Sequence, residues 1–156
     1  MNKEEFSRRR TTLMRMVGED GIAILPSAPV RTRSRDVEYR YRQDSDFYYL
    51  SGFPEPDAVA VIAPGRPNGE YLLFCRERHP LREQWDGSRA GQEGAIEAYG
   101  VDDAFPIEDV DDILPGILET RNRVYYTMGA YADFDQRMTE WVKSLRHRES
   151  SGIHTP

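Results

Sequence analysis

Two apolar runs on either side of a dense turn constrain the fold more than any other feature. Residues 58–63 read Ala-Val-Ala-Val-Ile-Ala, and residues 70–75 read Glu-Tyr-Leu-Leu-Phe-Cys. Because the runs are almost continuously apolar, both strands are expected to be covered on both faces. The Pro-Gly-Arg-Pro-Asn-Gly segment between them is rich in turn formers and predicts an antiparallel hairpin. A hairpin buried on both sides requires helices above and below it.

The remaining pattern supplies those helices and further strands. Apolar side chains at helical spacing predict helices over about 4–17, 46–50, 81–85, 93–99, 108–118 and 130–145. Strands are expected at 21–26 and 123–128, with a short one within 101–107. Ser45 is expected to cap the second helix, Gly52 to end it, and Pro115 to kink or end the acidic helix. The order favours an α/β domain with a mixed β-sheet and flanking helices.

Composition limits the class of protein. A chain of 156 residues suits one domain. Its mean hydropathy is −0.72, and no apolar run approaches the roughly 20 residues that span a bilayer. The N-terminus lacks the apolar core of a signal peptide. The one cysteine, Cys75, ends a buried strand and cannot form an internal disulfide, so a cytoplasmic location without membrane contact is expected.

A search for catalytic patterns finds little. There is no glycine-rich phosphate loop, no cysteine pair, no pair of histidines at helical spacing and no serine in a nucleophile elbow. Carboxylates gather on and before the acidic helix, but they do not alternate with apolar residues on core strands. We therefore expect neither catalytic nor metal-binding residues in this chain. The candidates so rejected are Asp102, Asp103, Glu108, Asp109, Asp111 and Asp112.

Charge is unevenly distributed along the chain. The first 42 residues are net basic, the middle is strongly acidic, and the whole chain carries −6. This asymmetry suggests self-association or contact with another domain, although solvated helix faces would give the same pattern. The Arg8-Arg9-Arg10 run could bind phosphates, but it is interpreted as a solvated face whose side-chain stems cover apolar surface. Within it, Arg10 falls at the helical spacing of the apolar side chains, whereas Arg8 and Arg9 point elsewhere. Arg31, Arg33 and Arg35 precede Tyr39 and Tyr41 and could bind nucleic acid, but a pI near 5.1 argues against that partner.

Residues 39–57 combine aromatic rings with arginine and aspartate, a mixture that is costly to bury unless the polar groups pair. Arg42 and Asp46 are expected to form such a pair. On that basis, Arg42→Ala would destabilise the fold by roughly 2–4 kcal/mol.

Three motifs resemble one known family. They are Tyr39-x-Tyr41-Arg42-Gln43-x-Ser45-Asp46-Phe47-x-Tyr49-x-x-Gly52-Phe53-x-Glu55-Pro56, Phe6-x-x-Arg9-Arg10-x-x-Leu13, and Trp85-x-Gly87-x-Arg89-x-Gly91-Gln92. Together they resemble the N-terminal domain of bacterial Xaa-Pro aminopeptidase (aminopeptidase P), in the creatinase and prolidase-like group. The sequence departs from the family pattern at Arg40 and Asp44, where proline and asparagine are common.

The resemblance implies a creatinase-type N-terminal domain with ribonuclease H-like topology over residues 1–149. Residues 150–156 would begin a linker, after a polar tail from Arg146, to a catalytic domain absent from this chain. That domain would hold two Mn²⁺ ions and cleave proline-containing peptides. The N-terminal domain itself would be non-catalytic, contact its own catalytic domain and neighbouring subunits, and close part of a neighbour's cleft.

The family pattern also implies residue roles. Asp36 and Trp85 would lie at the rim of the neighbour's active site, although Trp85 could instead pack against Tyr71 or Leu81. The residues of the structural motifs would be Tyr41, Arg42, Gln43, Asp46, Gly52, Pro56, Gly87 and Arg89.

Three alternatives stay open from the sequence. The chain could be a hydrolase using its acidic cluster, a free-standing peptide- or nucleic-acid-binding module, or the N-terminal domain of a prolidase or creatinase relative.

Overall fold

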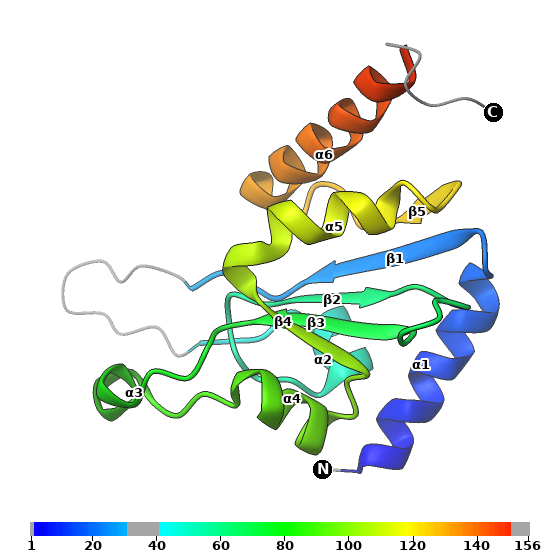
Figure 1. The fold of residues 1–156 in the computed structure, drawn as a ribbon. Helices are drawn as coiled ribbons and strands as arrows, with labels where there is room; N and C mark the ends of the chain where they lie inside the picture. Colours follow the sequence, from blue (N-terminus) through cyan, green and yellow to red (C-terminus); the bar gives the residue numbers. More distant parts are fainter. Residues whose placement is uncertain (1, 31–40, 151–156) are drawn as a thin grey trace.

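A five-stranded mixed sheet forms the centre of the molecule (Figure 1). The structure is a computed structural model that describes residues 2–30 and 41–150, with side chains as far as Leu145. The residues that the structure does not describe therefore include Asp36, Arg40 and the arginines at 31, 33 and 35. The strand order is β4-β3-β2-β1-β5. The strands are β1 (Gly21–Pro26), β2 (Val59–Ile62), β3 (Tyr71–Cys75), β4 (Asp103–Pro106) and β5 (Arg123–Tyr125).

The predicted hairpin is confirmed. Strands β2 and β3 pair antiparallel, with Val61 opposite Leu72, and β1 pairs antiparallel with the other edge of β2. The outer strands are both parallel to their neighbours, β4 to β3 and β5 to β1. The sheet is therefore mixed, as the sequence predicts.

The two faces of β2 explain why its sequence is apolar throughout. Val59 and Val61 point into a core shared with α5 and α6, whereas Ala60 and Ile62 point into a second core on the opposite face. Since successive side chains of a strand alternate between faces, a strand covered twice has no solvent-facing position.

Helices α1 (Lys3–Val17), α2 (Ser45–Ser51) and α4 (Gly91–Tyr99) surround the second core. Helix α1 is capped by Asn2, whose side chain accepts from the amides of Glu4 and Glu5. The N-cap of α2 is Asp44, which accepts from Phe47 N, so the prediction of Ser45 was wrong by one residue. Aspartate and serine cap almost equally well, and the sequence offered both in succession.

The opposite face is covered by α5 (Val110–Leu118), which follows the 3-10 turn Ile107–Asp109, and by α6 (Ala132–Ser150). Pro115 lies inside α5 and does not end it. The expectation of a polar tail from Arg146 was wrong for its first part, because α6 runs to Ser150. Arg and Glu are good helix formers, so polarity alone does not end a helix there.

The arginine run of α1 differs in part from the predicted solvated face, whereas the expected inward position of Arg10 is confirmed. Arg10 is only 6% exposed, its Nη1 donates to Leu50 O at 2.9 Å, and its guanidinium lies 4.3 Å from the centre of the Tyr71 ring. Arg9 donates to Tyr49 O and stacks on the Tyr49 ring. Two of the three arginines therefore fasten α1 to the end of α2, and only Arg8 fits the predicted solvated face.

Within residues 2–30 and 41–150, none of the helices is long and apolar enough to cross a membrane.

Candidate functional site

Helix α3 (Pro80–Asp86) lies between β3 and α4 in the chain and projects away from both layers of helices (Figure 1). None of its seven residues, all of which the structure describes, is buried. Trp85 is 87% exposed and Leu81 is 71% exposed. Tyr71 lies in the core, so the alternative that Trp85 packs against it is wrong. Among the described helices, α3 alone has no apolar side chain in either hydrophobic core.

Local sequence signals set both ends of α3. Pro80 occupies the first turn, where its missing N–H costs nothing, and His79 Nδ1 accepts from Arg82 N at 3.2 Å. Gly87 ends the helix with a φ of +95°, and its N–H donates to Glu83 O at 3.1 Å. A glycine suits this turn because side chains disfavour positive φ.

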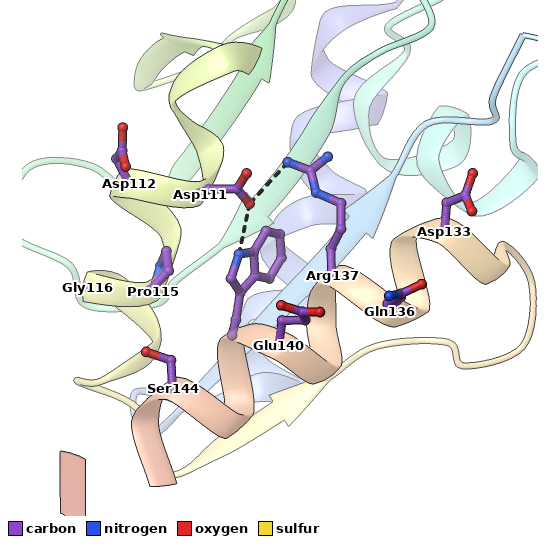
Figure 2. A pocket seen from close by; sticks show the side chains of 10 residues that line it. Asp111, Asp112, Pro115, Gly116, Asp133, Gln136, Arg137, Glu140 and Ser144 are labelled. Carbon is purple, nitrogen blue, oxygen red and sulfur yellow. Dashed lines mark hydrogen bonds and ion pairs between the residues drawn. The ribbon is translucent and has the colours of Figure 1, made fainter. Parts of the chain in front are cut away.

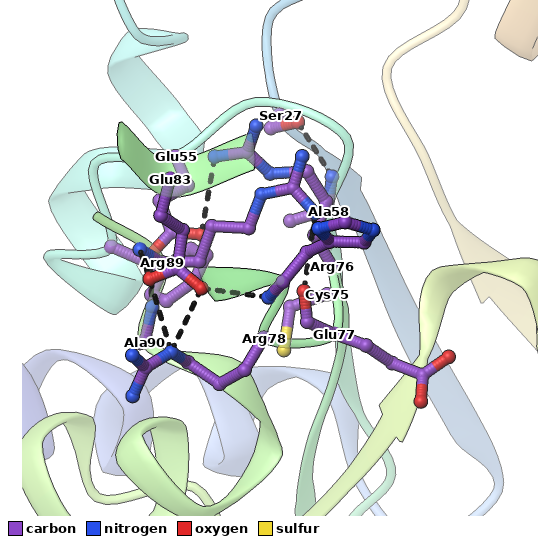
Figure 3. A network of polar contacts seen from close by, with 12 residues as sticks. Ser27, Glu55, Ala58, Cys75, Arg76, Glu77, Arg78, Glu83, Arg89 and Ala90 are labelled. Atoms are coloured by element: carbon purple, nitrogen blue, oxygen red, sulfur yellow. Dashed lines mark hydrogen bonds and ion pairs between the residues drawn. The ribbon is translucent and has the colours of Figure 1, made fainter. Parts of the chain in front are cut away.

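A single carboxylate, that of Glu83, binds the chain segments at the two ends of α3, which together form the stem of this helix. Glu83 accepts from Arg78 Nε at 3.0 Å, from His79 N at 2.7 Å and from Arg89 N at 3.0 Å, and its side chain is only 9% exposed (Figure 3). The Arg89 amide is the main cause that lowers the pKa of Glu83 to about 2, followed by the Arg78 side chain. The carboxylate is therefore ionised throughout the physiological range.

A second carboxylate joins this stem to the sheet. Glu55 accepts from Ala90 N at 2.8 Å and lies 3.4 Å from Arg76 Nη2, directly after β3 (Figure 3). The Arg89 side chain donates to Glu77 O at 3.2 Å. This bond joins the segment that follows α3 to the segment that precedes it. The position of α3 is thus fixed at its stem and not by packing of the helix itself.

Gln43 organises the segment that carries Glu55. Its amide donates to Phe53 O and Glu55 O, and its oxygen accepts from the backbone N–H groups of Ala28 and Asp44. The Tyr41 hydroxyl lies 2.9 Å from the same oxygen and 2.6 Å from Ala28 O. Burial is the main cause that raises the pKa of Tyr41 to about 12. Because both the amide nitrogen and the oxygen of Gln43 are hydrogen-bonded, this side chain fixes the loop around Ala28 against the segment 53–55.

The remaining motif residues divide into two groups. Gly52 takes the left-handed conformation, with a φ of +67°, and a Cβ there would lie 2.9 Å from the Phe6 ring. Pro56, four residues further along the chain, is half-buried. Arg42 and Asp46 are both exposed, and the described structure records no ion pair between them. The predicted pair is therefore wrong, because both side chains point to solvent, where pairing has little value.

The stretch of the chain that carries these residues matches a family model. The model is described as "Aminopeptidase P, N-terminal domain", and it matches residues 6–125. The chain belongs to the aminopeptidase P family.

Relatives agree along the whole aminopeptidase P N-terminal domain. Xaa-Pro aminopeptidase of Escherichia coli K12 is 36% identical over 100% of this chain and 36% of its own length. Xaa-Pro aminopeptidase 3 of Rattus norvegicus is 34% identical over 99% of this chain and 34% of its own length. The solved aminopeptidase PepP of Pseudomonas aeruginosa superposes with a TM-score of 0.91 at 59% identity, over 97% of this chain and 34% of that chain. The chain spans about a third of these proteins.

The acidic helix of this aminopeptidase P domain borders a groove of about 780 Å³ between α5 and α6 (Figure 2). Asp111 Oδ1 accepts from Arg137 Nη2 at 3.2 Å and from Trp141 Nε1 at 3.0 Å. Elsewhere, Asp102 accepts from the amides of Glu70 and Tyr71. These acids serve structural bonds, and in the part of the chain that the structure describes, no three His, Cys, Asp or Glu residues converge as metal ligands would.

The sequence singles out Trp85, which is exposed on α3, but gives no sign of the carboxylate that holds this helix. Glu83 stands two residues before Trp85 and belongs to none of the quoted motif positions. Its partners are mostly backbone amides, and a bond to an amide leaves no trace in residue identity. The one usable signal was an acidic residue in the first turn of a helix that begins with proline.

Proposed function

We propose that this chain is the non-catalytic N-terminal domain of an Xaa-Pro aminopeptidase that works in the cytoplasm. Residues 1–149 are the domain, and residues 150–156 begin the linker to a catalytic domain. The whole enzyme removes an N-terminal residue that precedes proline, using two Mn²⁺ ions held by the catalytic domain. Support comes from the family match and from relatives that are about three times as long as this chain.

Within that enzyme, we assign the domain a role in assembly and in shaping the active-site rim of a neighbouring subunit. The observation that carries this role is Trp85, an 87% exposed tryptophan on a helix braced at its stem. A large exposed indole on an ordered support is typical of residues that anchor protein contacts. Asp36 is assigned to the same rim on its family position alone.

The first experiment compares two proteins in one assay. The 156-residue chain and the same protein continued past Pro156 to the length of its relatives are each incubated with an Xaa-Pro peptide and Mn²⁺. We expect turnover from the longer protein only. Turnover by the 156-residue chain would overturn the proposal.

The second experiment concerns the rim. In the longer protein, Trp85→Ala should lower kcat/KM by about fivefold or more, the loss that corresponds to a contact residue worth over about 1 kcal/mol. Met128→Ala is the matched control, because Met128 is also an exposed apolar side chain but lies in the turn after β5. Equal effects of the two substitutions on kcat/KM and on the mass measured by light scattering would contradict the rim role.

A further inference from the structure

We propose that Glu83 is a positioning residue for Trp85: its carboxylate joins the two ends of the α3 segment and so fixes where the indole points. The functional part of this inference rests on the rim role proposed for Trp85. The structural part stands on the geometry of the segment alone. Glu83 itself need not touch a substrate or a neighbouring subunit.

Helical geometry separates the two side chains. Each residue advances about 100° around an α-helix, so residues two apart lie about 200° apart and face opposite directions. Glu83 faces the stem, where its carboxylate is nearly covered, and Trp85 faces solvent. Leu81 lies four residues before Trp85 and shares its face. The inner face of α3 is therefore polar and anchored, while the outer face is apolar and free.

The bonds of Glu83 span the segment from one end to the other. His79 N precedes the helix and Arg89 N follows it, and both donate to this one carboxylate, at 2.7 and 3.0 Å. Arg78 Nε lies 3.0 Å from both carboxylate oxygens. One charged group thus closes a loop of eleven positions, from 79 to 89.

The His79 cap and the Arg89–Glu77 bond each supply one hydrogen bond at the ends of α3, whereas Glu83 binds three different residues. An isolated helix shorter than about 12–15 residues is marginal in water, and α3 has seven residues and no buried side chain. Residues that make no hydrophobic contact depend on polar bonds at their ends. Loss of the Glu83 carboxylate should therefore release α3, and Trp85 with it, while both hydrophobic cores stay intact.

A direct test uses the two tryptophans of the chain, Trp85 and Trp141. Protein labelled with 5-fluorotryptophan gives one ¹⁹F resonance for each. In Glu83→Gln, we expect the Trp85 resonance to shift or broaden, whereas that of Trp141, which is 5% exposed in a core, stays in place. Glutamine keeps the size of the side chain but loses its charge and half of its accepting capacity.

Glu93→Gln is the matched control, since Glu93 is an exposed carboxylate in the first turn of α4. It should leave both resonances unchanged. An unchanged Trp85 resonance in Glu83→Gln would overturn the inference. Movement of both resonances would also overturn it, because Glu83 would then support the whole domain.

A second test uses the longer protein and a double-mutant cycle. If Glu83 acts through Trp85, Glu83→Gln should lower kcat/KM by several-fold, and the Glu83→Gln/Trp85→Ala double variant should be no worse than Trp85→Ala alone. Full additivity of the two losses would overturn the positioning role.

The two proposals fail in different ways. If Trp85→Ala left kcat/KM unchanged, the rim role would fall, and the ¹⁹F result would decide the inference about Glu83 by itself. If Trp85→Ala were damaging and Glu83→Gln were neutral, the rim role would stand and the positioning role would fall.

Discussion

Arg10 and Arg42 belong to the same family pattern but lie in opposite surroundings. The Arg10 guanidinium is buried, donates to a carbonyl of α2 and contacts the face of Tyr71, whereas Arg42 is exposed. A buried charge is costly unless it is hydrogen-bonded, so its partners matter more than its identity. Residue type alone does not distinguish the two positions.

We expect Arg10→Ala to lower the free energy of unfolding by roughly 2–4 kcal/mol, because it removes a charged hydrogen bond and the stem that covers the Tyr71 ring. Arg42→Ala should change it by less than about 1 kcal/mol, as exposed charges usually do. Urea denaturation of both variants measures the difference. A larger effect at Arg42 would restore the pair that the sequence suggested.

At the scale of single elements, the sequence predicted each described strand and α-helix, with bounds within three residues except at the end of α6, because periodicity is a local signal. The helix caps and the side chains that hold a helix end in place were harder to predict. Whether Asp44 or Ser45 caps α2, and whether Glu83 holds α3, depends on the distance between a carboxylate and backbone amides. That distance is set by tertiary structure, so the sequence could single out Trp85 as a candidate but could not show what holds its helix in place.

Two glycines, Gly52 at the end of α2 and Gly116 in α5, test how backbone conformation affects stability. Gly52→Ala should destabilise the domain by at least about 1 kcal/mol, because the left-handed backbone disfavours a side chain and the new Cβ meets the Phe6 ring. Gly116→Ala is the control, since that site in α5 has open space and no positive φ. It should stabilise the domain by about 0.5–1 kcal/mol. The opposite signs are read from two thermal melts, and a shared sign would contradict the assignment.

Helix α3 should give a pH signature. The pKa of Glu83 is about 2 in the folded protein and about 4.3 in an unfolded chain, so the carboxylate stabilises the fold above pH 4.3. That contribution is lost as the pH falls from about 4.3 to 2. The difference in Tm between wild type and Glu83→Gln should thus be full at pH 7 and shrink across this window. A difference that did not depend on pH would show that the charge of Glu83 is unimportant.

At the scale of the whole molecule, the two hydrophobic cores share one sheet. Strand β3 sends Leu72 and Phe74 to one core and Leu73 and Cys75 to the other. Neither core can open without exposing strands that support its counterpart. The domain should therefore unfold in a single cooperative transition.

Cys75 can report that transition. It is fully buried, and burial is the main cause that raises the pKa of its thiol to about 11, so the native thiol is protonated and inaccessible at pH 8. Its labelling by a disulfide reagent should require global opening. We expect the free energy derived from labelling rates to equal that from urea denaturation, and a much lower value would reveal local opening near β3.

Because no side chain of α3 lies in either core, the residues on its outer face need not fit a packed interior, as most residues of the chain must. We therefore expect a substitution at Leu81 or Trp85, both exposed, to change the stability of the domain little. Selection on these two positions can then act through whatever they contact, almost independently of folding. A lineage could retune that contact by changing two side chains while the scaffold beneath them stays the same.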